Sequence, residues 1–395
     1  MIRVGFLINF NHLKWLGGTY VIKNLIYCIN LYSKKEIEPI LIIKKNLSKI
    51  EKKEFRNIRL LKTNFFHNQN FFTRIYNKFL IFVFGRSNKY DNFFIENNLD
   101  ILSHSNALSN SLFLGRKSLI KSLPFLADLQ YLHFPENFSY KNILLRKLNI
   151  IMCALHSSKI ILSSLDAKKD LKKVSKTGYA KSIVHPFIFK SPEKKEILNL
   201  SLLKKKYHIP SNFFYLPNQY RIHKNHIVVL KALKFLKDKN KLDDLLIIST
   251  GHSEDHRNFN YFNTIKDFIS INNLKDNYKY LGIVPFKDVL SLIYHSVALI
   301  HPSKFEGRSS PVEQAKSIGK QVILSNIDIH KEQNPIRGKY FNPDSYSKLS
   351  SLMSKSWNSY SRTNEKRFID NAYKKNERDL HKYYNDYLKI LKNLQ

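Results

Sequence analysis

Short apolar runs that alternate with amphipathic stretches decide what this chain can fold into. The first run, Val4–Ile8, precedes an amphipathic stretch from Tyr20 to Leu31, and similar runs follow at Pro39–Ile43, Leu99–Ser103, Ser122–Leu126 and Lys159–Ser163. Strands buried on both faces read as continuous apolar runs, and the helices between them form the crossovers of a parallel sheet. The first half of the chain is therefore predicted to be an α/β domain.

The same alternation restarts after a lysine-rich stretch that ends near Pro210. Strands are predicted at Phe213–Leu216, Asp244–Thr250, Tyr278–Leu281, Ala298–His301 and Gln321–Leu324, with helices at 225–237, 261–271, 287–294 and 311–318. We expect two doubly wound, Rossmann-like parallel-sheet domains, over 1–195 and 205–362, whose strand ends face a central cleft. The segment 363–395 is predicted to be a long helix that can cross back to the first domain.

Composition excludes several classes of protein. The chain has 395 residues, 43% of them hydrophobic, which favours folded domains over disorder. Its two cysteines, Cys28 and Cys153, form neither a disulfide scaffold nor a zinc-ligand spacing. The first apolar run is interrupted too soon, by Asn9 and His12, to suggest a signal peptide, and there is no apolar run of about 18 residues, so we expect neither a signal peptide nor a transmembrane helix. We expect a soluble protein of the cytoplasm.

The net charge of +35 would draw the protein to polyanions such as nucleic acid, anionic lipid or phosphorylated small molecules. A general bias towards Lys, Asn and Ile, as an AT-rich genome produces, explains the same charge without a function. Between 55 and 90 there is no acidic residue, while seven Lys or Arg are interleaved with ten Phe or Tyr. This segment is either a buried strand or helix with basic flanks or an element at a membrane surface.

The most informative stretch is 301–333. An apolar strand leads into a polar loop with Glu306, and a helix begins near Pro311, because proline is favoured in a first helical turn. The backbone N–H groups from Ser309 to Val312 would offer hydrogen bonds and the positive end of the helix dipole to a diphosphate. His301 and His330 are expected to close a strand and to cap a turn.

This stretch resembles the signature of the family 4 retaining glycosyltransferases of the GT-B fold, in which two glutamates mark the nucleotide-sugar donor site. Phe305-Glu306-Gly307 matches the first glutamate, whereas Gln314 stands at the second, with Glu313 one residue before it. The resemblance implies that Glu306 holds sugar hydroxyls and that Gln314 or Glu313 holds the ribose. We favour Gln314, because one helical step turns Glu313 by about 100°.

A second matching segment is 213–237. In the resembled family an Arg and a later Lys bind the donor diphosphate; here Lys224 takes the Lys position, Gln219 takes the Arg position, and Arg221 follows two residues on. Cations at a helix start suit a pyrophosphate. The alternative is a solvated loop with incidental charges.

The first half of the chain carries weaker matches. Gly17-Gly18, after the first predicted strand, resembles the family's flexible glycine loop, beside which Trp15 and Tyr20 would shape an acceptor pocket. His133 resembles a histidine that contacts the donor sugar. The alternatives are a tight turn and a structural histidine. Further polar candidates beside His133 are Asp128 and Glu136.

The resemblance implies a glycosyltransferase that moves a sugar from a GDP- or UDP-sugar to an acceptor hydroxyl with retention of configuration, without a metal or other cofactor. The expected catalytic residues are Glu306, His133 and Lys224, and the expected donor-binding residues are Gly17, Gly18, Arg221, Lys224, Glu306, Gly307, Ser309, Ser310, Val312, Glu313 and Gln314. The basic, aromatic segment favours a lipid-linked saccharide acceptor, an anionic membrane surface as partner, and a place at the inner face of the cytoplasmic membrane, as in surface polysaccharide or lipopolysaccharide synthesis.

Two other classes of protein fit parts of the sequence. A GT-B protein that binds sugar nucleotides but has lost catalysis would explain Gln314. A nucleic-acid-binding protein would explain the charge, but the sequence has no RNP pattern, helix-turn-helix or zinc spacing, so no specific nucleic acid is expected.

Overall fold

The computed structural model describes residues 1–7, 16–45, 58–66, 71–106, 114–240, 244–255 and 257–394. The chain forms two compact units, one of Met1–Phe187 with Leu380–Gln395 and one of Ile188–Asp379. Each unit contains one sheet whose paired strands are all parallel, so the predicted fold class with two Rossmann-like sheets is confirmed. The amino-terminal part of the first unit ends at Phe187, before the end at residue 195 that the sequence predicts for the first domain.

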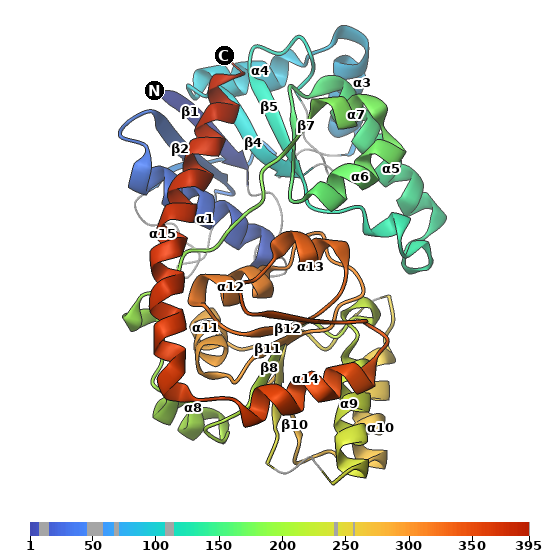
Figure 1. Cartoon of the computed structure of the whole chain (residues 1–395). Coiled ribbons are helices and arrows are strands. Elements are labelled where there is room, and N and C mark those ends of the chain that lie inside the picture. The colour runs from blue at the N-terminus through green and yellow to red at the C-terminus, as the bar shows by residue number, and fades with distance from the viewer. Residues whose placement is uncertain are drawn as a thin grey trace. The chain divides into compact units, whose positions relative to one another are not determined.

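The sheet of the first unit has seven strands in the order β3-β2-β1-β4-β5-β6-β7. Figure 1 labels most of its strands, which run from blue to green, together with the helices that connect them. The strands are β1 (Ile2–Leu7), β2 (Ile37–Ile43), β3 (Arg59–Lys62), β4 (Ile101–Asn106), β5 (Lys121–Leu126), β6 (Ile160–Leu162) and β7 (Ser182–Val184). The helices are α1 (Leu16–Tyr32), α3 (Phe71–Phe84), α4 (Asn88–Glu96), α5 (Tyr140–His156), α6 (Leu165–Val174) and α7 (Lys176–Lys181).

Three features of the first unit differ from the sequence prediction. Gly17 and Gly18 lie in the first turn of α1 and not in a loop. The N–H groups of a first turn have no partner within the helix, so glycine lowers helix stability little at this position. Trp15 lies outside the described residues. The sequence analysis did not predict β3 and β7, because both strands are short and have charged residues at or beside their ends. The apolar run at 79–84 lies in α3, where only Ile81 of that run is buried.

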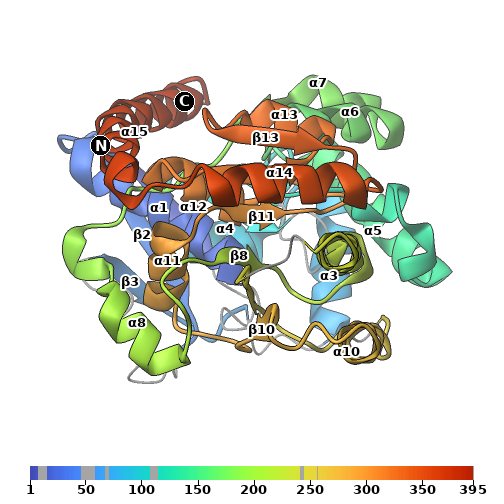
Figure 2. The same cartoon turned by 60° about the horizontal axis from the view of Figure 1, so that its bottom comes forward.

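The sheet of the second unit has six strands in the order β10-β9-β8-β11-β12-β13. Figure 2 turns this unit towards the viewer, with β8 and β11 at its centre. The strands are β8 (Phe214–Pro217), β9 (Ile247–Thr250), β10 (Tyr278–Tyr280), β11 (Leu299–His301), β12 (Val322–Ser325) and β13 (Gly338–Phe341). The helices are α8 (Leu200–Tyr207), α9 (His226–Asp238), α10 (Tyr261–Ile271), α11 (Phe286–His295), α12 (Ser310–Ile318), α13 (Asp328–Gln333), α14 (Tyr346–Asn358) and α15 (Arg362–Lys392).

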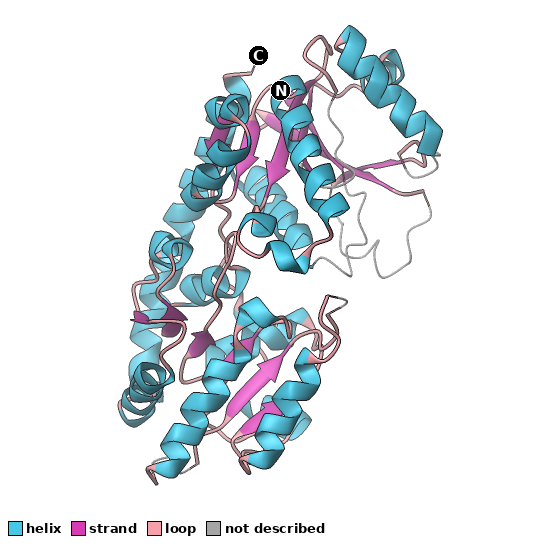
Figure 3. Ribbon diagram, turned by 90° about the vertical axis from the view of Figure 1, so that its right-hand side faces the viewer, coloured by secondary structure: helices cyan, strands magenta, loops and turns pink. Residues whose placement is uncertain are grey.

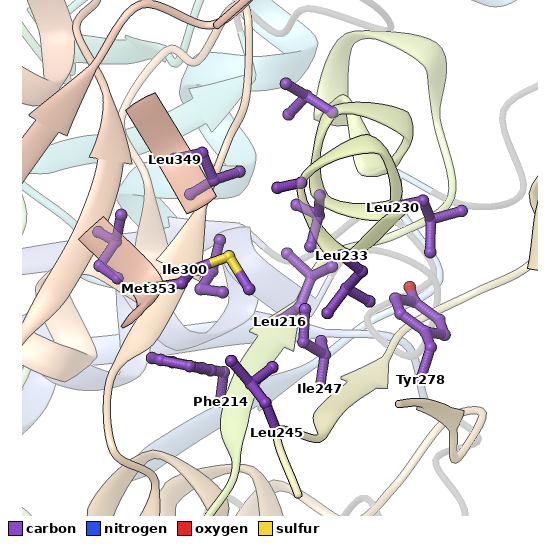
Figure 4. Close-up of a cluster of buried hydrophobic side chains, with 14 of the residues drawn as sticks. Phe214, Leu216, Leu230, Leu233, Leu245, Ile247, Tyr278, Ile300, Leu349 and Met353 are labelled. Atoms are coloured by element: carbon purple, nitrogen blue, oxygen red, sulfur yellow. The ribbon is translucent and has the colours of Figure 1, made fainter. Parts of the chain in front are cut away.

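Both faces of the second sheet are covered by helices, which Figure 3 shows in cyan beside the magenta strands. Successive strand residues point to opposite faces. Phe214 and Leu216 pack with residues of α9, α10 and α14 in the apolar cluster of Figure 4. Tyr215, between them, packs in a second cluster with residues of α8, α11 and α12. This two-sided burial explains why the strands read as uninterrupted apolar runs.

Helix α15 contributes to each unit in turn. In the second unit its Glu365 accepts hydrogen bonds from Lys320 Nζ at 2.8 Å and from Arg337 Nη2 at 2.7 Å. From Leu380 onward it belongs to the first unit, where Tyr387 Oη donates to Ser103 Oγ at 2.8 Å.

Candidate functional site

The strand order of the second sheet turns back at its centre. The chain starts at β8, adds β9 and β10 on one side, and then returns to place β11 on the other side of β8. In doubly wound sheets, ligands bind outside the carboxyl ends of the strands at such a switch point. The segments that follow β8 and β11, 218–225 and 302–309, therefore border the candidate site.

Two hydrogen bonds hold these segments together. The Lys304 N–H donates to the His223 carbonyl at 2.7 Å, and Asn225 Nδ2 donates to the Pro302 carbonyl at 3.1 Å. Asn225 has a φ of 58°, a left-handed conformation that asparagine adopts more readily than most residues. It separates the single turn Ile222–Lys224 from α9.

Lys224 and His301 converge on the carboxylate of Glu306. Lys224 Nζ lies 2.6 Å and His301 Nε2 lies 2.9 Å from Glu306 Oε1. The imidazole is fully buried, and the carboxylate side chain is 9% exposed. Burial alone would raise the pKa of Glu306, but the Lys224 charge and the His301 hydrogen bond hold that pKa well below its usual value. Burial lowers the pKa of His301 despite that bond. The site therefore holds a charged Lys–Glu pair supported by a histidine that favours its neutral form.

Ser309 links this pair to the start of α12. It is the N-cap, and its Oγ accepts from the Val312 N–H at 3.3 Å and lies 2.8 Å from His301 Nε2. The Ser309 N–H donates to Gln333 Oε1 at 3.2 Å. Since Pro311 has no N–H, two of the three N–H groups expected to meet a diphosphate already have side-chain partners. An incoming anion would compete with the serine cap and with Gln333.

Glu313 and Gln314, the two candidates for holding a ribose, have different surroundings. The buried carboxylate of Glu313 accepts from Arg308 Nη2 at 2.7 Å and from Gln333 Nε2 at 2.9 Å. Gln314 is also buried, and its backbone carbonyl accepts from Ser317 Oγ. Among the residues that the structure describes, none hydrogen-bonds to the side-chain amide of Gln314. The amide is thus the group with capacity for a further partner.

Further cations surround the turn before α9. Arg257 Nε lies 3.0 Å from Asp255 Oδ1. Burial lowers the pKa of His223 to about 3, and the charges of Lys224, Arg221 and Arg257 act in the same direction. The charges of all three cations therefore reach the His223 imidazole.

The other predicted donor-binding residues of this unit differ in exposure. Gly307 and Ser310 are half-buried. The Val312 side chain is fully buried in the apolar cluster that contains residues of α11, so its N–H is the part that a ligand could use.

The remaining predicted residues belong to the first unit. His133 follows the single turn Gln130–Leu132, and its Nε2 lies 2.5 Å from Asp170 Oδ2 on α6. Asp170 is buried and also pairs with Lys173 at 2.8 Å. Asp128 Oδ1 accepts from the Gln130 N–H at 3.1 Å. Glu136 is exposed, and Gly17 and Gly18 belong to α1.

Sequence reasoning missed the partners of the predicted residues. His301 was expected to close a strand. It is the last residue of β11, at the carboxyl edge of the sheet, and this position could have identified it as a candidate site residue. Arg308 belongs to the same loop as Glu306. The pairing of Asp170 with His133 could not be predicted from the sequence, because the two residues lie 37 positions apart.

Within the described ranges, no group of three or more His, Cys, Asp or Glu side chains is arranged to hold a metal ion. Among the same residues, no helix is both long and apolar enough to cross a membrane.

The two-sheet architecture is that of the GT-B glycosyltransferases. A glycosyltransferase from Rickettsia africae ESF-5 is 19% identical, with a TM-score of 0.69 over 100% of this chain and 98% of that one. Anabaena HepE in complex with UDP-glucose is 15% identical, with a TM-score of 0.69 over 100% of both chains. WaaG, a glycosyltransferase involved in lipopolysaccharide biosynthesis, is 13% identical, with a TM-score of 0.62 over 98% of this chain and 99% of that one. At these identities the likeness establishes the fold.

Residues 202–375 match the model of the family described as glycosyl transferases group 1. The matched range includes Lys224, Glu306 and the start of α12, and it supports the group 1 resemblance predicted from the sequence. The narrower assignment to family 4 stays a prediction. No curated protein matches the chain.

Proposed function

We propose that the protein is a glycosyltransferase that binds a nucleotide diphosphate sugar at the switch point of its second sheet. The observation that carries the proposal is the convergence of Lys224 and His301 on Glu306 beside the carboxyl ends of β8 and β11. This arrangement supplies a cation for a phosphate and a carboxylate for sugar hydroxyls at the place where such sheets bind ligands. It lies inside the range that matches the group 1 family.

In this proposal Lys224 and Arg221 stabilise the negative charge that develops on the departing diphosphate. Fixed cations in a largely buried site stabilise such charge more strongly than water does. The Lys224 ammonium group, which donates to Glu306 in the structure, would donate to a phosphate oxygen instead. The N–H groups of Gly307 and Ser310 would be further hydrogen-bond donors to the diphosphate. The dipole of α12 adds to the same effect.

Glu306, still held by His301, would accept hydrogen bonds from the hydroxyls of the transferred sugar, and Gln314 would accept one from the ribose. A neutral amide accepts such a bond about half as strongly as a carboxylate does. We propose transfer with retention of configuration, by front-face displacement. The assignment of His133 to the sugar stays a prediction.

A UDP-sugar is proposed ahead of a GDP-sugar, because the Anabaena HepE structures hold UDP and UDP-glucose. For the acceptor we propose a lipid-linked saccharide, with hexosyl transfer at the inner face of the cytoplasmic membrane during surface polysaccharide or lipopolysaccharide assembly. The involvement of WaaG in lipopolysaccharide biosynthesis supports this choice.

Thermal unfolding with UDP, GDP, ADP and CMP tests the donor site, because a ligand that binds the folded state stabilises it by mass action. We expect one diphosphate, UDP first, to raise Tm by several degrees at saturation. Lys224→Ala should lose this shift, and Lys304→Ala, which breaks an exposed pair with Asp344, should keep it. Equal shifts in both variants, or none with any nucleotide in the parent, would contradict the proposal.

A sugar-nucleotide-binding protein without catalysis is the second candidate. The neutral Gln314 amide, at the position of the second family glutamate, favours it. UDP release from UDP-glucose, with and without saccharide acceptors, separates the two: binding without any release supports the second candidate.

A further inference from the structure

Helix α3 presents apolar side chains outward along one stripe. Their spacing of three or four residues places them on a single helix face. Each is at least half exposed, Phe72 the most at 78%, and the set is Phe72, Ile75, Tyr76, Phe79, Phe82 and Val83. The inward face carries Asn77, whose Oδ1 accepts from Ser87 Oγ at 2.7 Å. Ile81, also on the inward side, is buried in the core of the first unit, so α3 has apolar side chains on its outward face as well as inward.

Helix α5 carries a second exposed apolar stripe. Its members are Tyr140, Leu144, Leu145, Leu148, Ile151 and Leu155. Lys78 Nζ of α3 donates to Asn149 Oδ1 of α5 at 3.3 Å, so the two helices are directly linked. We call the two stripes together the α3–α5 surface. Single exposed apolar residues are common, but a set of this extent marks an interaction site.

The α3–α5 surface has cations and no acids. The segments 71–90 and 140–165 contain no Asp or Glu. Exposed on them are Arg86, Lys89, Lys141 and Lys147. A partner for this surface must accept apolar side chains and positive charge at once.

Two more cations are fixed beside the end of α3. Gly115 has a φ of 105°, and a Cβ there would lie 2.1 Å from the Gly85 carbonyl oxygen. This close approach, together with a hydrogen bond of 2.9 Å from the Lys117 N–H to the same oxygen, brings Arg116 and Lys117, both exposed, beside the carboxyl end of α3.

We infer that the α3–α5 surface docks on an anionic lipid bilayer. Aromatic and aliphatic side chains enter the boundary between headgroups and acyl chains, while Lys and Arg stay at the level of the phosphates. A second copy of this chain would bring one cationic surface against another. A nucleic acid would engage the cations and leave the apolar stripes uncovered. The inference does not depend on glycosyl transfer.

Vesicle sedimentation of the full chain tests this docking, with phosphatidylcholine vesicles and with equal parts of phosphatidylcholine and phosphatidylglycerol. The test variant carries Phe72→Ser, Phe79→Ser and Phe82→Ser. The matched control carries Phe259→Ser, Ile271→Ser and Ile336→Ser, at residues of the second unit that are at least as exposed as the three phenylalanines. We expect the parent and the control to bind the mixed vesicles, and the test variant to lose about ten-fold or more of that binding. The double variant Lys141→Gln with Lys147→Gln should bind the mixed vesicles several-fold less than the parent. Added salt should weaken the binding of the parent to these vesicles.

Circular dichroism would show that the test variant is folded. An unchanged Tm shift with UDP would show that its donor site is intact, so that a loss of vesicle binding could not be attributed to the donor site. Equal vesicle binding by parent and test variant would overturn the inference, as would equal binding to both kinds of vesicle. A dimer that the test variant dissociates, without vesicle binding, would assign the surface to a second copy. Loss of duplex DNA binding instead of vesicle binding would overturn it as well.

Discussion

Lys224 Nζ and Glu306 Oε1 lie 2.6 Å apart, although the two residues are 82 positions apart in the sequence. They come from the segments after β8 and β11, which are neighbours only because the strand order turns back between them. The lysine side chain is 17% exposed and the carboxylate 9%. A phosphate that binds at this place must compete with Glu306 for the same ammonium group, so donor binding and the ion pair are coupled.

Replacing Lys224 by Ala should lower the free energy of unfolding by about 2–4 kcal/mol, because it leaves a buried carboxylate without its cation. Adding Glu306→Gln to this variant should recover part of the loss. Lys304→Ala, in an exposed pair, should cost less than about 1 kcal/mol. Urea unfolding at neutral pH measures all three. A loss for Lys224→Ala as small as that for Lys304→Ala would show that the pair is not coupled to folding.

Gln314→Glu should tighten UDP binding by roughly three- to ten-fold, since a carboxylate accepts a hydroxyl bond more strongly than an amide does. Calorimetry with UDP and with 2′,3′-dideoxy-UDP isolates the ribose contribution, because the gain should vanish with the analogue. Glu313→Gln is the matched variant: it deprives the buried Arg308 of the nearer of its two carboxylate partners, so it should reduce stability. A gain in ribose-dependent affinity from Glu313→Gln would assign the ribose to that neighbour instead.

Stability should fall as the pH is lowered from about 6.5 towards 3. Burial lowers the pKa of His104, His226 and His330 to about 3 each. In the unfolded chain these groups protonate near 6.5, so in this window the unfolded state binds more protons and is favoured. His226, stacked on Tyr220 at 4.1 Å, can be replaced by Phe. His226→Phe should make the pH dependence shallower, by about 2–3 kcal/mol between neutral pH and pH 4.5. Parallel urea curves for parent and variant at each pH would contradict this.

Glu365→Gln should destabilise the second unit by about 3 kcal/mol at neutral pH, because Lys320 is fully buried and Glu365 is its carboxylate partner. Burial lowers the pKa of Lys320 to about 8 despite that pair. Since a neutral amine is easier to bury, the loss should shrink as the pH rises above neutrality. Thermal unfolding at neutral pH and at pH 9 checks the direction, with Lys375→Ala, from the exposed pair with Asp379, as the control. A loss that grows with pH would rule out this explanation.

Most of the fold could be predicted from the local spacing of apolar residues along the sequence. Helix α10 occupies 261–271, as its apolar spacing predicts, and the runs at Phe213–Leu216 and Ala298–His301 became β8 and β11 within a residue or two. The errors lie where local signals are weak. β3 has charged ends, and Gly17-Gly18 indicates a turn as readily as a first helical turn. The exposed stripe of α3 has the same periodicity as a buried one, so the sequence could not decide which way it faces.

The amino-acid sequence by itself determined that this chain forms two parallel-sheet α/β arrays, because helix and strand periods are local properties. The resemblance of its motifs to the family 4 glycosyltransferases singled out Lys224, Glu306 and Gln314 as the residues to examine. Only the tertiary structure decided that His301 contacts Glu306, that Arg308 and Gln333 engage Glu313, and that Asp170 pairs with His133. Such contacts depend on strand order and on burial, which bring together side chains that no local rule relates.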